Sequence, residues 1–197
     1  MVKSKKVTQK SYPEIPVSKI REMMGVIKNQ RPDFYRVIYF LLRTGRRVEE
    51  TTLIEKSDVI LGDNFTPKTI LVRAETTKTK TKSSLELFDE DLRLHIREAY
   101  ASSASRKAPY LFINKDGRKC NQQRICAFLK LVSKAICGVT ITPHYFRHRF
   151  LTECAKQKVP LKDSMSVSGL RDFKVLMTYY SHVSQDGMVQ VYNATKI

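Results

Sequence analysis

Hydrophobic positions recur every three to four residues along most of this chain, which is the spacing of amphipathic helices. Ser18 is expected to cap the first helix. The Pro32–Asp33 pair predicts the start of a second helix, which we expect to end at Gly45 because glycine readily adopts the left-handed conformation that closes helices. A short third helix is expected over residues 48–54. Residues 18–54 are therefore predicted to be mainly helical.

Two segments have the composition of β-strands, residues 69–75 and 83–88, and the lysine- and threonine-rich stretch between them predicts a cationic hairpin tip. Asp89 and Asn121 are expected to cap two further helices. The Thr142–Pro143 pair predicts another helix start, because proline is favoured at the first helical position. The sequence therefore predicts an α+β fold, mainly α-helical, with one small antiparallel sheet.

The length of 197 residues suits a single domain. We expect residues 1–15 to form a basic, flexible N-terminal segment and residues 16–197 to form the domain itself. No apolar run reaches the roughly 18 residues that a membrane span needs, and no signal-peptide pattern follows the basic start. We therefore expect a cytoplasmic protein with no membrane partner. The four cysteines lack CxxC spacing, which favours free thiols over a zinc site.

Lysine and arginine total 36 against 19 acidic residues, so the formal net charge is 36 − 19 = +17. Ordinary surfaces mix the two signs, whereas this excess favours a nucleic-acid partner, since basic surfaces release the counterions of phosphates. Phosphate-binding glycine loops and the motifs of zinc proteases and serine hydrolases are absent from the sequence. The acidic residues are not clustered as paired metal ligands, which disfavours a metal-dependent nuclease.

Three cationic motifs lie at predicted element boundaries. Residues 44–50, Thr-Gly-Arg-Arg-Val-Glu-Glu, place arginines directly after a glycine turn. His144 and Arg147 share a face in the first turn of a predicted helix, where free N–H groups attract anions. Arg171 stands nine residues before Tyr180. Taken singly, each motif is better explained by a solvated basic surface or a packed tyrosine than by a site.

In this order the motifs resemble the catalytic domain of the tyrosine recombinase, or phage-type integrase, family, over about residues 16–182. The family pattern T-G-x-R-[IV]-x-E is matched by residues 44–50. The resemblance implies that Arg47 is the first catalytic arginine and that Glu50 supports it.

The family's H-x-x-R-H motif is matched by His144, Arg147 and His148. The resemblance implies that the first two are catalytic and that His148 is supporting. A catalytic lysine on a β-hairpin is also implied, which favours Lys80, with Lys78 as the alternative.

The last motif departs from the family pattern, because Gly169 is not followed by the usual histidine. Counting from Leu170 makes Tyr179 the nucleophile. The Tyr-Ser-His sequence instead favours Tyr180 and places Arg171 in the histidine position, which is similar to divergent integrases of archaeal viruses and plasmids. We favour Tyr180 with Arg171 as a catalytic residue, and Tyr179 is the alternative.

The resemblance implies site-specific cleavage and rejoining of double-stranded DNA, as in viral genome integration. Two arginines would hold the phosphate, a histidine would assist, and the lysine would protonate the leaving 5′-oxygen. The tyrosine would form a 3′-phosphotyrosyl bond that another strand reverses without metal, ATP or any other cofactor. Self-association as a tetramer on DNA is implied as well.

Two other functions fit the same residues. A type IB topoisomerase-like enzyme would use this chemistry to relax DNA as a monomer, and a DNA-binding protein without activity would keep only the basic cleft. An RNA-binding module has no support from the sequence. Family members carry an N-terminal DNA-clamping domain, and we expect it to be absent because about fifteen residues precede the pattern.

The charge predicts a steep dependence of DNA binding on salt. About six phosphate contacts would weaken binding on the order of 10³-fold between 50 and 200 mM salt. Fluorescence anisotropy on a labelled duplex measures this slope, and a flat response would contradict binding along phosphates.

Overall fold

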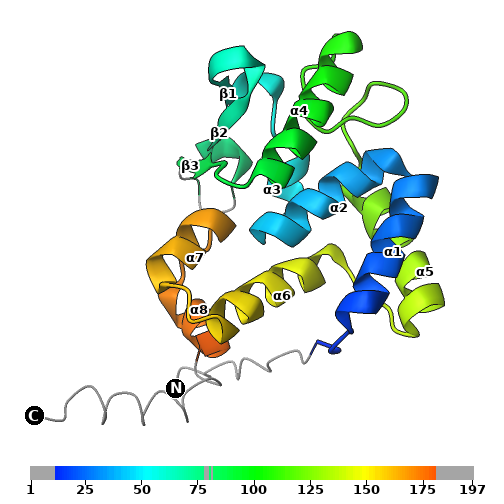
Figure 1. The fold of residues 1–197 in the computed structure, drawn as a ribbon, viewed down its shortest axis with the longest axis vertical. Coiled ribbons are helices and arrows are strands. Elements are labelled where there is room, and N and C mark those ends of the chain that lie inside the picture. Colours follow the sequence, from blue (N-terminus) through cyan, green and yellow to red (C-terminus); the bar gives the residue numbers. More distant parts are fainter. Residues whose placement is uncertain (1–11, 78–79, 81, 181–197) are drawn as a thin grey trace, which may run out of the picture.

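The computed structural model describes residues 12–77, 80 and 82–180, which form a mainly helical domain with one small sheet (Figure 1). No helix in this part of the chain is long and apolar enough to cross a membrane. The α-helices are α1 (Val17–Gln30), α2 (Pro32–Thr44), α3 (Val48–Thr52), α4 (Glu90–Ser105), α5 (Gln122–Cys137), α6 (Pro143–Lys156), α7 (Leu161–Ser168) and α8 (Phe173–Tyr180). The strands are β1 (Val59–Leu61), β2 (Pro67–Val72) and β3 (Ser83–Glu86), with short 3-10 turns η1 (Lys56–Asp58), η2 (Asp63–Phe65) and η3 (Ala74–Thr76).

Most predicted helix boundaries are confirmed. The side chains of Asp89 and Asn121 accept the backbone N–H three residues later and cap α4 and α5. Gly45 ends α2 at φ +64°, in the left-handed conformation. The expected cap at Ser18 is wrong, because α1 already begins at Val17 and Pro16 occupies the cap position with no side-chain hydrogen bond.

The sheet has three antiparallel strands in the order β1-β2-β3, one more than predicted. Strand β1 is only three residues long and lies between two 3-10 turns, so it is too short to show alternation in the sequence. The predicted strand over 69–75 stops at Val72, and residues 74–76 turn away instead. Arg73 fixes this turn through ion pairs with Glu55 at 2.9 Å and Asp58 at 3.2 Å.

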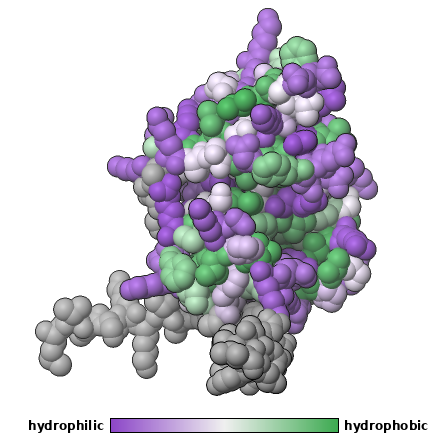
Figure 2. Space-filling model, turned by 60° about the vertical axis from the view of Figure 1, so that its left-hand side comes forward, coloured by the Kyte–Doolittle hydropathy of each residue, from purple (hydrophilic) through white to green (hydrophobic). Residues whose placement is uncertain are grey.

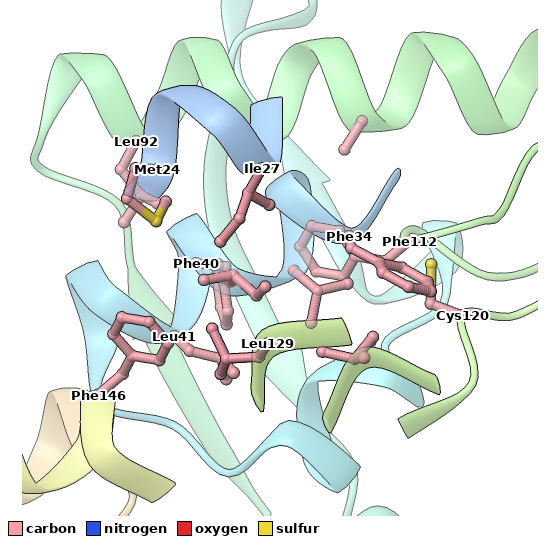
Figure 3. Close-up of a cluster of buried hydrophobic side chains, with 14 of the residues drawn as sticks. Met24, Ile27, Phe34, Phe40, Leu41, Leu92, Phe112, Cys120, Leu129 and Phe146 are labelled. Atoms are coloured by element: carbon pink, nitrogen blue, oxygen red, sulfur yellow. The ribbon is translucent and has the colours of Figure 1, made fainter. Parts of the chain in front are cut away.

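The main core surrounds α2, which packs against α1, α4 and α6. Figure 3 shows Phe34, Phe40 and Leu41 of α2 pointing into this core together with Phe146 of α6. All four side chains are at most 1% exposed. The helix that ends at Gly45 is therefore held rigidly before the chain enters the arginine motif.

A second, smaller apolar cluster joins α7 and α8 to α6, and its buried members are Leu151, Leu170 and Leu176. This cluster lies apart from the main core at one end of the domain (Figure 1). Helix α8 is thus attached mainly through α6, which carries the predicted H-x-x-R-H motif, whereas α7 contacts both α6 and β3.

Hydrophilic side chains project over most of the face shown in Figure 2, with smaller hydrophobic areas between them. The four cysteines are free, as the sequence predicts. Within the described residues, no group of three histidine, cysteine or acidic side chains is placed to hold a metal ion.

Gly45 gives a stability prediction with an internal control. A Cβ at Gly45 would lie 2.6 Å from Cδ1 of Phe150, whereas a Cβ at Gly138, which also has positive φ, meets nothing within 4 Å. Gly138→Ala should lose about 1–2 kcal/mol of unfolding free energy from backbone strain alone. Gly45→Ala should lose about 1–3 kcal/mol more from overpacking. Urea unfolding measures both, and equal losses would contradict the contact with Phe150.

Candidate active site

Two buried arginines cap the C-terminal end of α7 by donating hydrogen bonds to its last carbonyls. Arg46, from the turn after α2, donates from Nε to the carbonyl of Val167 at 2.7 Å and from Nη2 to the carbonyl of Ser166 at 3.0 Å. Arg147, from α6, donates from Nη1 to the carbonyl of Ser168 at 2.7 Å. The last carbonyls of a helix have no partner within the helix, and they carry the negative end of its dipole. The two guanidiniums provide hydrogen-bond donors for these carbonyls and positive charge beside the negative end of the dipole.

The same Nη1 of Arg147 also donates to the carbonyl of Gly45 at 2.8 Å. Arg147 therefore joins three elements: its own helix α6, the turn after α2, and the end of α7. Gly169, which follows α7 at φ +62°, makes room for the arrangement. A Cβ on Gly169 would lie only 2.5 Å from Nη1 of Arg46.

Burial changes the acidity of both arginines. It lowers the pKa of Arg46 to about 10, because the charged guanidinium loses its hydration. The pKa of Arg147 falls to about 10, mainly through burial and secondly through the nearby charge of Arg47. Both values remain well above neutrality, so the two side chains stay cationic at pH 7.

Arg47 and Glu50 form an ion pair beside these arginines, with Nη1 of Arg47 donating to Oε1 of Glu50 at 2.7 Å. The Glu50 side chain is buried, whereas that of Arg47 is 28% exposed. Two buried polar atoms here, Oε2 of Glu50 and Nη2 of Arg147, have no hydrogen-bond partner among the residues that the structure describes. A buried donor without a partner is unfavourable unless a ligand completes it.

Arg47, Arg147 and His144 line one cavity of about 280 Å³, which also borders Gln122 and Cys126 of α5. His144 is exposed in the first turn of α6, and Arg147 lies one turn further along the same helix. The structure thus brings together three of the predicted catalytic residues around one positively charged hollow. An anion with several oxygens, such as a phosphate, suits this lining.

Arg171 lies at a second hollow of about 290 Å³, which Arg46 and Glu50 also border. The Arg171 side chain is exposed and its Nη2 donates to the carbonyl of Lys82 at 3.2 Å. Arg46 lines both hollows and forms part of the wall between them. Arg171 therefore lies near Arg46, but it lines the second hollow, whereas Arg147 and His144 line the first.

The two candidate tyrosines at the end of α8 have different surroundings. The ring of Tyr179 lies edge-on to the ring of His148, with centroids 5.1 Å apart. Burial raises the pKa of Tyr179, and the charge of Arg147 opposes that rise. Tyr180 turns elsewhere, since its hydroxyl donates to the carbonyl of Val159 at 2.8 Å and lies 2.9 Å from Oγ of Ser164. The structure brings Tyr179, and not Tyr180, toward the arginine and histidine motifs.

Lys80 is exposed and has a positive φ of 49°, and its backbone N–H donates to the carbonyl of Thr77 at 3.1 Å. It therefore lies in the connection between β2 and β3, where the sequence predicts a hairpin tip. Lys78, the alternative lysine, lies outside the described residues.

The sequence did not identify two residues that lie beside the candidate site residues, Arg46 and Tyr12. Arg46 was not expected to have a role, and no motif marks it apart from its place beside Arg47. Tyr12 belongs to the segment predicted to be flexible, yet its ring stacks on His148 with centroids 4.4 Å apart. His148 therefore contacts an aromatic ring from the N-terminal segment and another from α8.

The chain is similar to known proteins in both sequence and fold. Residues 14–186 match the model of the phage integrase family. The chain is 26% identical over 164 residues to tyrosine recombinase XerC of Bacillus pumilus, a match that covers 79% of this chain and 51% of that protein. The chain thus spans about half the length of the curated relatives it matches.

Solved structures agree on the fold. The crystal structure of XerA recombinase matches 96% of this chain and 66% of that chain, with a TM-score of 0.69 and 16% sequence identity. The Tn1549 transposon integrase, solved in complex with transposon right end DNA, matches 96% of this chain and 68% of that chain, with a TM-score of 0.67 and 16% identity. The predicted fold class is confirmed.

The stacking of Tyr12 on His148 gives a pH prediction. Burial, together with the nearby His144, lowers the pKa of His148 below its usual value, because the imidazolium loses hydration. Tyr12→Ala admits water and should therefore raise the pKa of His148 toward the ordinary value of about 6.5. An NMR titration measures this change. His95, which contacts Tyr35 and Tyr39 instead, should titrate unchanged, and an unaltered His148 would contradict the shielding by Tyr12.

Proposed function

This chain belongs to the phage integrase family, and we propose that it is the catalytic part of a site-specific tyrosine recombinase that cleaves and rejoins double-stranded DNA. The observation that carries the proposal is the Nη2 of Arg147, which is buried, cationic and without a partner among the described residues. It borders the cavity that Arg47 and His144 share. A DNA phosphate is the ligand that would complete it.

The arginines supply the electrostatic part of the reaction. Attack on a phosphodiester increases the negative charge on the non-bridging oxygens, and fixed guanidiniums stabilise that charge. Arg147 cannot turn away, because its Nη1 is held by two carbonyls at 2.7 and 2.8 Å. Arg47 is held by a single ion pair with the buried Glu50. Preorganised donors avoid reorganisation during the reaction, which is why a rigid pair is effective.

We propose Tyr179 as the nucleophile. Its support is the ring contact with His148 and its electrostatic interaction with Arg147. Tyr180 has its hydroxyl occupied by Val159 and Ser164, which is typical of a packing role. The preference for Tyr180 drawn from the sequence remains a prediction, and the geometry favours the alternative register, which counts from Leu170. In that register Arg171 does not occupy the histidine position.

The proposed cleavage step is balanced as follows. The phenol oxygen of Tyr179 forms a bond to phosphorus while its proton passes to His144, and the bond from phosphorus to the 5′-oxygen breaks. The ammonium group of Lys80 gives a proton to that leaving oxygen. The products are a 3′-phosphotyrosyl bond and a free 5′-hydroxyl. Attack by another 5′-hydroxyl reverses the step, and side chains alone supply the chemistry.

Double-stranded DNA is the proposed partner, and the excess positive charge and the DNA-bound integrase structure support it. Exchange between two duplexes breaks four strands and uses one tyrosine for each. We therefore propose that four copies assemble on two DNA sites. We also propose that the protein acts on DNA in the cytoplasm.

Paired tyrosine variants test the nucleophile. On a nicked duplex that traps the covalent intermediate, Tyr179→Phe should form no adduct, because the attacking oxygen is gone. Tyr180→Phe should still form it and should lose about 1 kcal/mol of unfolding free energy, since its hydroxyl is hydrogen-bonded in the fold. Denaturing gels detect the adduct, and peptide mass spectrometry identifies the modified tyrosine.

Other outcomes identify the competing functions. Loss of the adduct only in Tyr180→Phe would refute Tyr179 and favour the Arg171 register. DNA binding without an adduct in the wild-type chain would favour a binding protein without activity. Relaxation of supercoiled DNA without exchange between two sites would favour a topoisomerase-like enzyme.

A further inference from the structure

The base of the connection that carries Lys80 is tied to the end of α7 by two arginines. Nη1 of Arg46 donates to Oγ of Ser83 at 3.2 Å, and Ser83 is the first residue of β3. Nη2 of Arg171 donates to the carbonyl of Lys82 at 3.2 Å. Both contacts reach the strand only two or three residues after Lys80.

The side chain of Arg46 is held more tightly than that of Arg171. Its side chain is buried, and it also donates to the carbonyls of Ser166 and Val167, whereas Arg171 is exposed. A buried guanidinium loses hydration and is held in place by the hydrogen bonds that replace it. Moving Arg46 away from Ser83 would therefore disturb its bonds to α7.

The end of α7 is also where Arg147 is held, through the carbonyl of Ser168. Ser83 is linked through Arg46 to the carbonyls of residues 166 and 167, and the proposed phosphate ligand Arg147 binds the next carbonyl, that of residue 168. A short, rigid chain of contacts connects the base of the lysine-bearing connection to the proposed phosphate site. Lys80 precedes Ser83 by three residues, a span of at most about 10 Å.

We propose that Arg46 is a positioning residue that places Lys80 at the leaving 5′-oxygen by holding Ser83 against the end of α7. The inference rests on the proposed function, because it takes Lys80 to be the general acid. Arg46 does not touch the phosphate in this account. Its effect on the leaving group passes through the hydrogen bond to Ser83, and its bonds to the end of α7 support the fold separately.

The nature of the leaving group separates this role from general support of the fold. An oxygen leaving group needs a proton, whereas a sulfur leaving group departs readily as a thiolate, since thiols have a reference pKa of about 8.5. A nicked duplex with a 5′-bridging sulfur at the scissile phosphate therefore makes the general acid unnecessary. Single-turnover cleavage of the oxygen and sulfur duplexes would be compared across variants of the full chain.

Ser83→Ala removes only the acceptor for Arg46 and is the mildest variant, while Arg46→Met removes the donor and keeps an apolar stem. Ser84→Ala, at the next and exposed position of β3, is the matched control. Lys80→Ala reports the loss of the acid itself. Thermal unfolding of each variant verifies the fold, and Ser83→Ala decides the question if Arg46→Met does not fold.

We expect Ser83→Ala to slow cleavage of the oxygen duplex about 5- to 10-fold, the order of one hydrogen bond, and Arg46→Met to slow it further. With the sulfur duplex Ser83→Ala and Lys80→Ala should both cleave within about threefold of wild type, and Arg46→Met should recover in part, because it also loses its bonds to the end of α7. Ser84→Ala should be unaffected on both duplexes. This pattern would establish the positioning role.

Equal slowing on both duplexes by Arg46→Met and Ser83→Ala, with Lys80→Ala still restored by sulfur, would overturn the inference and leave the proposed function intact. Cleavage of the oxygen duplex at the wild-type rate by Ser83→Ala would also overturn it. Failure of sulfur to restore Lys80→Ala would instead refute Lys80 as the acid in the proposed function, and the inference would fall with it.

Discussion

The structure depends on the capping of α7 by Arg46 and Arg147. Three successive carbonyls at the end of a short helix need donors, and two guanidiniums from different parts of the chain supply them. One arginine comes from the turn after α2 and the other from α6, so the cap holds the main core and the C-terminal helices together. The left-handed Gly169 is needed at this point, because a larger residue would collide with Arg46.

The cap also prepares the proposed phosphate site. Arg147 uses one nitrogen for structure and keeps Nη2 buried and without a partner among the described residues. Burial lowers its pKa to about 10 but leaves it charged at neutral pH. The folding energy of the surrounding contacts thus maintains an unsatisfied cation beside Arg47 and His144. The proposed DNA phosphate would satisfy it, and binding of that substrate would then complete the site.

Much of the fold and of the candidate site could be predicted from the sequence, because helix boundaries and motifs are encoded by residues close together in the chain. Gly45, Asn121 and the Thr142–Pro143 pair mark helix boundaries through the chemistry of single residues, and the spacing of the motifs identified the family. The sequence could not predict β1, which is too short to show a period. It favoured Tyr180 over Tyr179 and did not reveal the contacts of Arg46, because adjacent residues differ there only in which way the backbone points them. Those directions are set by long-range contacts with Val159, Ser164 and the end of α7.

The proposed function depends above all on a DNA phosphate that accepts a hydrogen bond from the buried guanidinium of Arg147. A crystal structure of the chain on a nicked duplex, trapped with Tyr179→Phe, tests it most directly. We expect a non-bridging oxygen of the scissile phosphate about 2.7–2.9 Å from Nη2 of Arg147, the usual length of such a charged hydrogen bond. A scissile phosphate bound at Arg171 in the other hollow, with Nη2 of Arg147 still unpaired, would contradict it.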